Sequence, residues 1–146
     1  MLLTMTAFNL DFDRLPSGWV DQSVYTFKGP LVDGLEHLLI VTLDRRLPPD
    51  ATTLAPFVEQ KSSVIRKSYP ESRVMKDGAV TLDNTNAHEL VLEWPMSETL
   101  TRIVQYYFAI VENTGFTFWS TYADVSFSLL RSDVRKLVVS LLAQVG

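Results

Sequence analysis

Residues 102–111, RIVQYYFAIV, constrain the fold most, because they alternate like a β-strand and yet are apolar on both faces. One face carries the even-numbered residues Val104, Tyr106, Phe108 and Ile110. The other carries the odd-numbered residues Ile103, Gln105, Tyr107, Ala109 and Val111. Antiparallel sheets usually pack one face on a core and leave the other polar, and two helices would not cover both faces of such a sheet. We therefore expect one apolar face to serve a binding partner, a dimer interface or both.

The rest of the chain predicts a sheet with two helices. Apolar residues at helical spacing predict helices at 54–69, which Pro70 ends, and at 126–144. Turn residues separate the extended segments, including Lys28-Gly29-Pro30 and Asp77-Gly78, and a hairpin is expected at 113–115. Strands are expected at 6–12, 20–27, 38–43, 72–76, 80–82, 87–94, 103–111 and 115–122. This order predicts an α+β fold, a twisted antiparallel β-sheet with both helices packed on one face.

Composition excludes several classes of protein. The 146 residues, 47% hydrophobic and 21% charged, fit a single domain over 1–146. The formal net charge of -4 and the pI of about 5.1, with scattered basic residues, argue against nucleic-acid binding. The absence of cysteine excludes a disulfide scaffold, a thiolate zinc site, a cysteine nucleophile and a lipoprotein anchor cysteine.

The N-terminal sequence bears on location. The segment MLLTMTAFNLDFD has no basic residue before its short apolar run, and Asp11 and Asp13 interrupt that run. We therefore expect no signal peptide and a cytoplasmic location. The longest apolar runs elsewhere fall short of the roughly 20 residues of a membrane helix, so the protein is not expected to insert into a membrane itself.

No catalytic or metal-binding pattern stands out. His88-Glu89 resembles the start of a zinc protease motif, but Leu92 occupies the position of the second histidine. Neither His88 nor His37 accompanies a GxSxG nucleophile motif, and the glycines form no phosphate-binding loop. Glu89 and Glu93 share a strand face and are interpreted as solvated charge. The sequence predicts no enzyme activity, no metal and no cofactor.

Five segments, taken in order, resemble a known family. They are LPSGWVDQSVYTF at 15–27, LIVTLDR at 39–45, the first-helix segment 57–60, Glu93-Trp94 at a strand end, and Gln105 in the next strand. Together they span nearly the whole chain and resemble the DcrB-like (DUF1795) family. Within that family, an acidic chain of this size without a signal sequence resembles the Eag chaperones of bacterial type VI secretion.

This resemblance implies both a fold and a function. The implied fold is a curved Mog1/PsbP-like antiparallel sheet with helices behind it, used as a homodimer. The implied function is to hold the N-terminal transmembrane segments of a secreted effector protein in an apolar concave groove before export. DcrB itself resembles a lipid-anchored envelope protein, and the missing signal and cysteine argue against that branch.

Gln105 is the leading candidate for client binding. A single amide among Ile103, Tyr107 and Ala109 could donate and accept hydrogen bonds with a Gly/Ala-rich helix, or it could be satisfied within the sheet. Gln60 matches a family glutamine in the first helix. The predicted client-binding residues are Gln105, Gln60, Val24, Thr26, Leu39, Val41, Ile103 and Tyr107.

The sequence leaves open which face of each strand points outward. Leu38 and Ile40 are the alternatives to Leu39 and Val41, and either Trp119 or Phe118 could join them. Two other functions also remain open. The chain could be an adaptor that acts through protein surfaces alone, or a domain of the same fold that binds a lipid or another small molecule.

Overall fold

The computed structural model describes residues 16–19, 22–45, 47 and 52–145. Its strands are β1 (Gln22–Val32), β2 (Leu35–Asp44), β3 (Arg73–Leu82), β4 (Thr85–Pro95), β5 (Thr101–Val111) and β6 (Thr114–Ala123). Its helices are α2 (Leu54–Ser68) and α3 (Asp124–Ala143). The expected strand at 6–12 lies outside the described residues. The α+β prediction is confirmed, and both helices begin and end within two residues of the predicted bounds.

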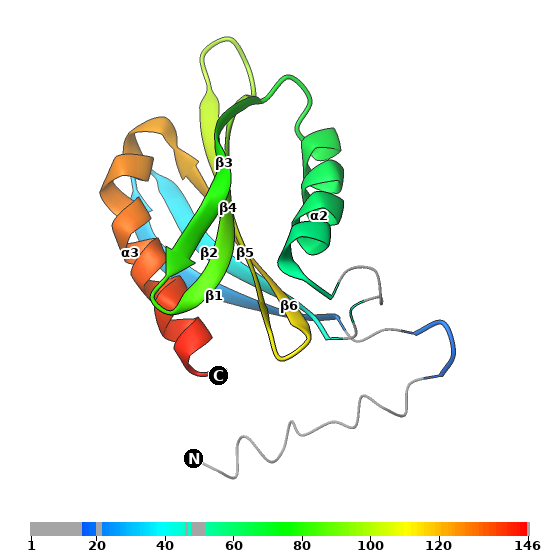
Figure 1. Cartoon of the computed structure of the whole chain (residues 1–146). Coiled ribbons are helices and arrows are strands. Elements are labelled where there is room, and N and C mark those ends of the chain that lie inside the picture. Colours follow the sequence, from blue (N-terminus) through cyan, green and yellow to red (C-terminus); the bar gives the residue numbers. More distant parts are fainter. Residues whose placement is uncertain (1–15, 20–21, 46, 48–51, 146) are drawn as a thin grey trace.

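The six strands form one antiparallel sheet in the order β1-β2-β6-β5-β4-β3 (Figure 1). The pairs β1–β2, β3–β4 and β5–β6 are joined by tight turns that use positive φ angles, at Asp33-Gly34, at Asp83 and at Glu112-Asn113. The last of these closes the predicted hairpin between β5 and β6, with Val111 paired to Thr114. Two-residue turns with positive φ match the twist of the strands they join, which explains their position here.

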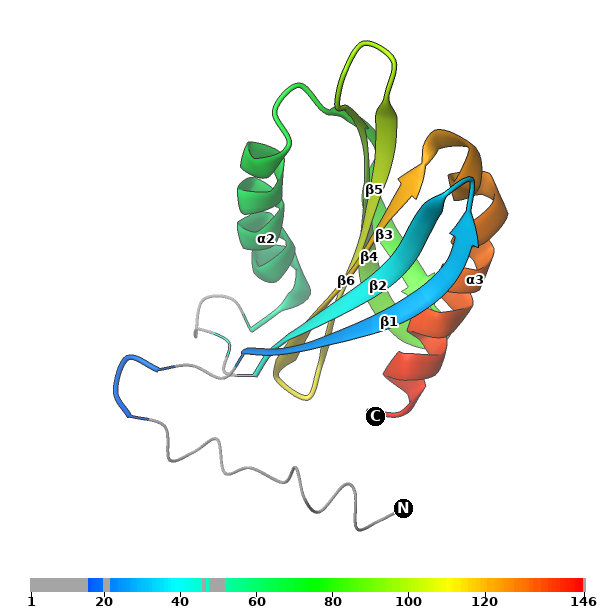
Figure 2. The same cartoon turned by 180° about the vertical axis from the view of Figure 1, so that it is seen from behind.

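The two helices lie on opposite faces of the sheet, so the prediction that both pack on one face is wrong (Figures 1 and 2). Phe57 and Val58 of α2 join Val104, Tyr106 and Phe108, the even-numbered residues of β5. On the other face, α3 inserts its buried residues among the odd-numbered side chains of β5: Val138 and Leu142 join Tyr107 and Ala109. One helix per face suffices because each needs to cover only part of a six-stranded sheet, and together they bury both apolar faces of β5.

Two predicted turns lie inside strands. Lys28-Gly29-Pro30 belongs to β1, and the register with β2 shifts between Lys28 and Leu31. Asp77-Gly78 lies within β3, where the register with β4 shifts between Val74 and Lys76, so that 72–76 and 80–82 form one strand. Both are edge strands, where Pro, Gly and bulges are tolerated because one side of the strand makes no ladder hydrogen bonds.

The helices cover the sheet unevenly. Helix α2 packs on β4 and β5, whereas α3 packs on β6, β5 and β3 from the other side. On the α2 side, the half of the sheet made by β1, β2 and β6 is therefore mostly uncovered. In the described part of the chain, α2 meets it at Gly115 through Phe57 and at Asp44 through Lys61. Neither α2 nor α3 is both long and apolar enough to cross a bilayer.

Gly115 at the start of β6 allows α2 to approach the sheet. A Cβ atom there would lie 2.5 Å from Cε1 of Phe57 and 3.1 Å from Cδ2 of Leu47. Phe57 is buried and packs edge-on against Phe108, so its ring cannot move aside without loosening the core. The substitution Gly115→Ala should therefore lower the free energy of unfolding by about 1–3 kcal/mol, as overpacked core sites do.

Urea unfolding of this variant and of Gly78→Ala tests the contact. A Cβ on Gly78, also in a strand, would meet nothing within 4 Å. The control should therefore match or slightly exceed the wild-type stability. Equal losses in both variants would contradict the role assigned to Gly115.

Candidate functional site

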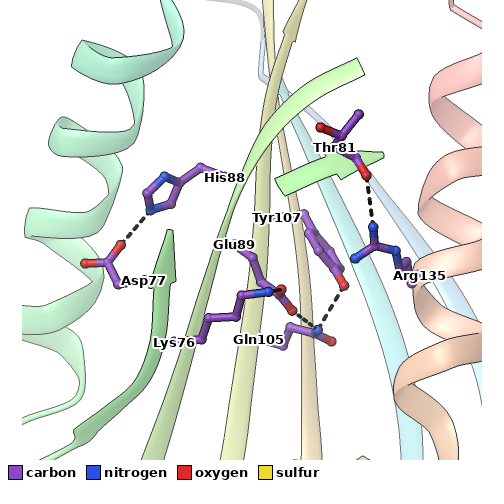
Figure 3. A network of polar contacts seen from close by, with 8 residues as sticks. All are labelled: Lys76, Asp77, Thr81, His88, Glu89, Gln105, Tyr107 and Arg135. Carbon is purple, nitrogen blue, oxygen red and sulfur yellow. Dashed lines mark hydrogen bonds and ion pairs between the residues drawn. The ribbon is translucent and has the colours of Figure 1, made fainter. Parts of the chain in front are cut away.

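Gln105 lies at the centre of a hydrogen-bonded network beneath α3 (Figure 3). Its Nε2 donates to Oε2 of Glu89 at 2.6 Å and to the hydroxyl of Tyr107 at 3.1 Å. Its Oε1 accepts from the hydroxyl of Tyr122 at 2.7 Å. These side chains meet because alternate residues of β4, β5 and β6 point to the same face of the sheet. Every hydrogen-bonding atom of the Gln105 amide thus has a partner within the protein.

Glu89 is a buried carboxylate, not the solvated charge that the sequence indicated. Its side chain is 1% exposed, and its Oε1 accepts from Nζ of Lys76 at 2.7 Å. Burial alone would raise the pKa of Glu89, but the hydrogen bonds from Lys76 and Gln105, together with the positive charge of Lys76, hold it below its ordinary value. The network therefore holds Glu89 ionised, with a cation on one side and an amide on the other.

Arg135 of α3 bounds this network on the side away from Lys76. Its Nη2 donates to the backbone carbonyl of Thr81 at 2.9 Å, which ties the helix to the end of β3. Burial and the charge of Glu89 raise the pKa of Tyr107 to about 12, although Arg135 opposes the shift. The Tyr107 hydroxyl is thus neutral at physiological pH and serves as a hydrogen-bonding group.

Five of the predicted client-binding residues lie on this covered face and not on a free surface. They are Gln105, Ile103, Tyr107, Leu39 and Val41, all buried. We expected these five residues to be exposed to a client, and this expectation is wrong. Residues of α3 pack over the odd-numbered face of β5 and cover it. For Gln105 the structure matches the alternative interpretation, an amide satisfied within the sheet.

The remaining predicted residues lie on the α2 side. Val24 and Thr26 of β1 are exposed there, in register with Thr42 and Ile40 of β2. Gln60 is exposed on α2, where it shares a shallow depression with Pro56, Ser63 and Val64. Of the alternatives left open by the sequence, Leu38, Ile40 and Trp119 are the ones on this side.

We define the open face as the uncharged central residues of β1, β2 and β6 that point to the α2 side of the sheet. Cross-strand register places them in adjacent rows, with Thr26, Ile40 and Trp119 in one row and Val24, Thr42 and Thr117 in the next. The open face comprises Val24, Thr26, Leu38, Ile40, Thr42, Thr117, Trp119 and Thr121.

The open face combines apolar groups with hydroxyls, and charged side chains border it. Four of its members are threonines, and the others are aliphatic residues and Trp119. Nζ of Lys28, which is in register with Leu38, lies 3.3 Å from Oε2 of Glu36. Nζ of Lys61 on α2 lies 2.6 Å from Oδ2 of Asp44. The sequence analysis missed Thr42, Thr117 and Thr121, although their parity with Val24 and Thr26 in the sheet follows once the strand register is known. Such a surface suits an uncharged partner with few polar groups.

A separate pocket of about 450 Å³ lies on the α3 side, between the ends of β1, β2 and β6 and the last turn of α3. Tyr25, Phe27, Val41, Leu43, Phe116 and Leu141 supply much of its apolar lining. Its size falls within the range of small-molecule sites. Val41 therefore lines a cavity, although not on the open face.

The two histidines make local contacts. Nε2 of His88 pairs with Oδ1 of Asp77 at 2.5 Å, near the surface as predicted, whereas His37 is buried with Nε2 2.8 Å from Oγ of Ser126. Among the described residues, no three His, Cys, Asp or Glu side chains gather in a way that could hold a metal ion.

The depressed pKa of Glu89 predicts a contribution to stability that depends on pH. Because the folded-state pKa is lowered, the contribution is fully present above the unfolded value of about 4.3 and is lost as the pH falls through the folded value. Glu89→Gln should lower the free energy of unfolding by about 1–3 kcal/mol at pH 7, and the deficit should shrink toward pH 3.

The matched control is Glu93→Gln on the same strand. The side chain of Glu93 is 30% exposed and that of its partner Arg73 is 73% exposed, so the change should stay near about 0.5 kcal/mol. Chemical denaturation at several pH values measures both variants. An equal effect of the two substitutions would contradict the network described here.

Comparisons with known proteins address the family. The profile of the DcrB family matches residues 14–136. PA94 from Pseudomonas aeruginosa, described as a protein of unknown function and putative regulator, is 17% identical, with a TM-score of 0.63 over 86% of this chain and 85% of that one. Cyanobacterial PsbP (CyanoP) from Synechocystis sp. PCC 6803 is 11% identical, with a TM-score of 0.46 over 88% and 93% of the two chains.

None of the curated proteins compared with the chain matches it. The similarity to PA94 concerns the fold, since the sequence identity is low. The family profile, by contrast, covers most of the chain and confirms the resemblance found in the sequence. The chain belongs to the DcrB family.

Proposed function

We propose that this protein is a chaperone or adaptor that binds and shields the N-terminal transmembrane helices of a type VI secretion effector, acts in the cytoplasm and performs no catalysis. Membership of the DcrB family and the resemblance to its Eag chaperones supply the class of function. The open face supplies the surface. In this proposal the client binds to the open face and not to the covered residues around Gln105.

The observation that carries the proposal is the unequal covering of the sheet. Helix α2 packs on β4 and β5, so Ile40 and Trp119 on the neighbouring strands are left only partly buried and Val24 is 55% exposed. A water-soluble partner would leave this apolar area partly hydrated, whereas a transmembrane helix is itself apolar and gains from covering it. The threonine hydroxyls can meet the small polar groups of such a helix.

The strength of binding is adequate for a carrier. A client helix that covers roughly 500 Å² of apolar surface gains about 12 kcal/mol at about 25 cal/mol per Å². Association and ordering cost several kcal/mol or more. The difference supports a complex that is stable during transport and yet releasable.

The proposal includes a homodimer. The edge strand β1 exposes apolar residues on both of its faces, with Val24 at 55% and Tyr25 at 51%. An edge strand with such side chains is open to pairing with a second copy. Light scattering across a dilution series should give twice the 16.5 kDa mass of one chain, and a single-chain mass at all concentrations would refute the dimer.

Adjacent residues of β1 provide a matched test of the open face. Val24 belongs to the open face and Tyr25 to the opposite face, and the two are exposed to similar extents. Val24→Asp should weaken binding of an effector's N-terminal apolar segment by at least about tenfold, because the carboxylate would have to be desolvated under the client. Tyr25→Asp should bind the segment like the wild type.

Co-expression with such a segment, followed by size-exclusion chromatography with mass spectrometry, measures complex formation by each variant. Circular dichroism verifies that both variants fold. A segment that precipitates while the folded wild-type protein elutes alone would overturn the chaperone function. Equal loss in both variants would move the client away from the open face.

The pocket on the α3 side favours a second candidate, a domain that binds an acyl chain. Tyr25 and Phe27 stand at the exposed side of this pocket, and Leu43 and Phe116 lie within its lining. Fluorescence titration with cis-parinaric acid distinguishes the two functions. Acyl binding should be abolished by Tyr25→Asp and unaffected by Val24→Asp, the reverse of the pattern expected for a helical client.

A further inference from the structure

Two buried polar groups on the open face have no hydrogen-bond partner in the described part of the chain. They are Oγ1 of Thr117 and Nε1 of Trp119, two residues apart on β6 and therefore on the same face. Buried polar groups are almost always paired, because an unpaired one loses its bond to water without replacement. Two such groups on the same face of one strand point to a partner that is not part of this chain.

The chemistry of the two groups defines that partner. An indole N–H can only donate a hydrogen bond, and the Thr117 hydroxyl can donate as well. The bound group must therefore be an acceptor. A neutral acceptor fits better than a carboxylate or phosphate, because the cations that border the open face, Lys28 and Lys61, are already paired with Glu36 and Asp44.

In an apolar helix, neutral acceptors are scarce. Backbone carbonyls within a regular helix already accept from the amide four residues on. A proline inside the helix removes one such amide and frees the carbonyl that it would have satisfied. A freed carbonyl in an apolar helix also has no water to pair with, so both sides of the contact gain from meeting.

We propose that Thr117 and Trp119 form a recognition site for a free backbone carbonyl at a proline break in the client helix. This inference rests on the proposed function and names the feature of the client that the open face selects. The ring of Trp119 stacks on Tyr106 with centroids 6.0 Å apart and is itself only partly buried.

The test uses two synthetic peptides of 20 residues, each a Leu/Ala helix with lysines at both ends. One carries a central proline and the other carries alanine there. The wild-type protein should bind the proline peptide about 3- to 10-fold more tightly by fluorescence anisotropy, the range for one or two net hydrogen bonds. Thr117→Val and Trp119→Phe should each reduce this preference, and the double variant should abolish it.

Matched controls come from the same fold. Thr101→Val changes a threonine of β5 outside the open face, and Trp94→Phe changes a tryptophan of β4, which packs against Tyr69. Neither Thr101 nor Trp94 contributes one of the unpartnered atoms, so both variants should keep the wild-type preference. Loss of the preference in the controls as well would overturn the assignment.

Stability supplies an independent readout. Because Oγ1 of Thr117 has no partner in the free protein, the nearly isosteric T117V should leave the urea midpoint unchanged or raise it. A lowered midpoint in T117V would mean that its hydroxyl already has a partner, and would overturn the inference. In the wild type, the Trp119 indole ¹H–¹⁵N resonance should move downfield with the proline peptide and not with the alanine peptide.

The outcomes separate this inference from the proposed function. If the wild type binds both peptides equally well, helix binding stands and carbonyl recognition fails. If it binds neither peptide, both fail. Preference for the proline peptide that survives in T117V and W119F would place its recognition elsewhere and overturn the site.

Discussion

Strand β5 is buried on both faces from Ile103 to Ala109, and the rest of the structure depends on this constraint. An isolated antiparallel sheet with such a strand would expose one apolar face to water. Helix α2 covers one face through Phe57 and Val58, and α3 covers the other through Val138 and Leu142. The small residue Gly115 lets Phe57 approach the sheet closely enough to do so. The protein therefore has a hydrophobic core on each face of the sheet, and β5 contributes side chains to both.

The same arrangement leaves the open face uncovered. On the α2 side, α2 is centred on β4 and β5 and meets β2 at Asp44 through Lys61, so Val24, Leu38 and Ile40 retain partial exposure. The hydrogen bonding of buried polar groups differs between the two faces of the sheet. Beneath α3, Gln105 and its neighbours satisfy one another, whereas on the open face Thr117 and Trp119 keep unpaired atoms. The satisfied network stabilises the fold, and the unsatisfied pair is available to a partner.

Much of the secondary structure could be predicted because its signals are local. The apolar spacing of α2, its end before Pro70, and the hairpin near Asn113 follow from the sequence within a few residues. The turns predicted at Lys28-Gly29-Pro30 and Asp77-Gly78 were wrong. Edge strand β1 takes up the first as an irregularity in its register, and edge strand β3 continues through the second in regular pairing with β4. Glu89 was misread as solvated because its burial depends on Lys76 and Gln105, which are distant in the sequence.

By itself, the sequence determined the order of strands and helices, the two apolar faces of β5 and the DcrB family, since alternation, helical spacing and ordered motifs are properties of the chain alone. It could not determine which helix covers which face. An apolar stripe on a helix shows that one side is buried but carries no information about the face of the sheet that receives it. Only the tertiary structure decided that Gln105 lies under α3 and that Val24 and Trp119 share an uncovered surface, because side assignment and cross-strand register arise from contacts between distant segments.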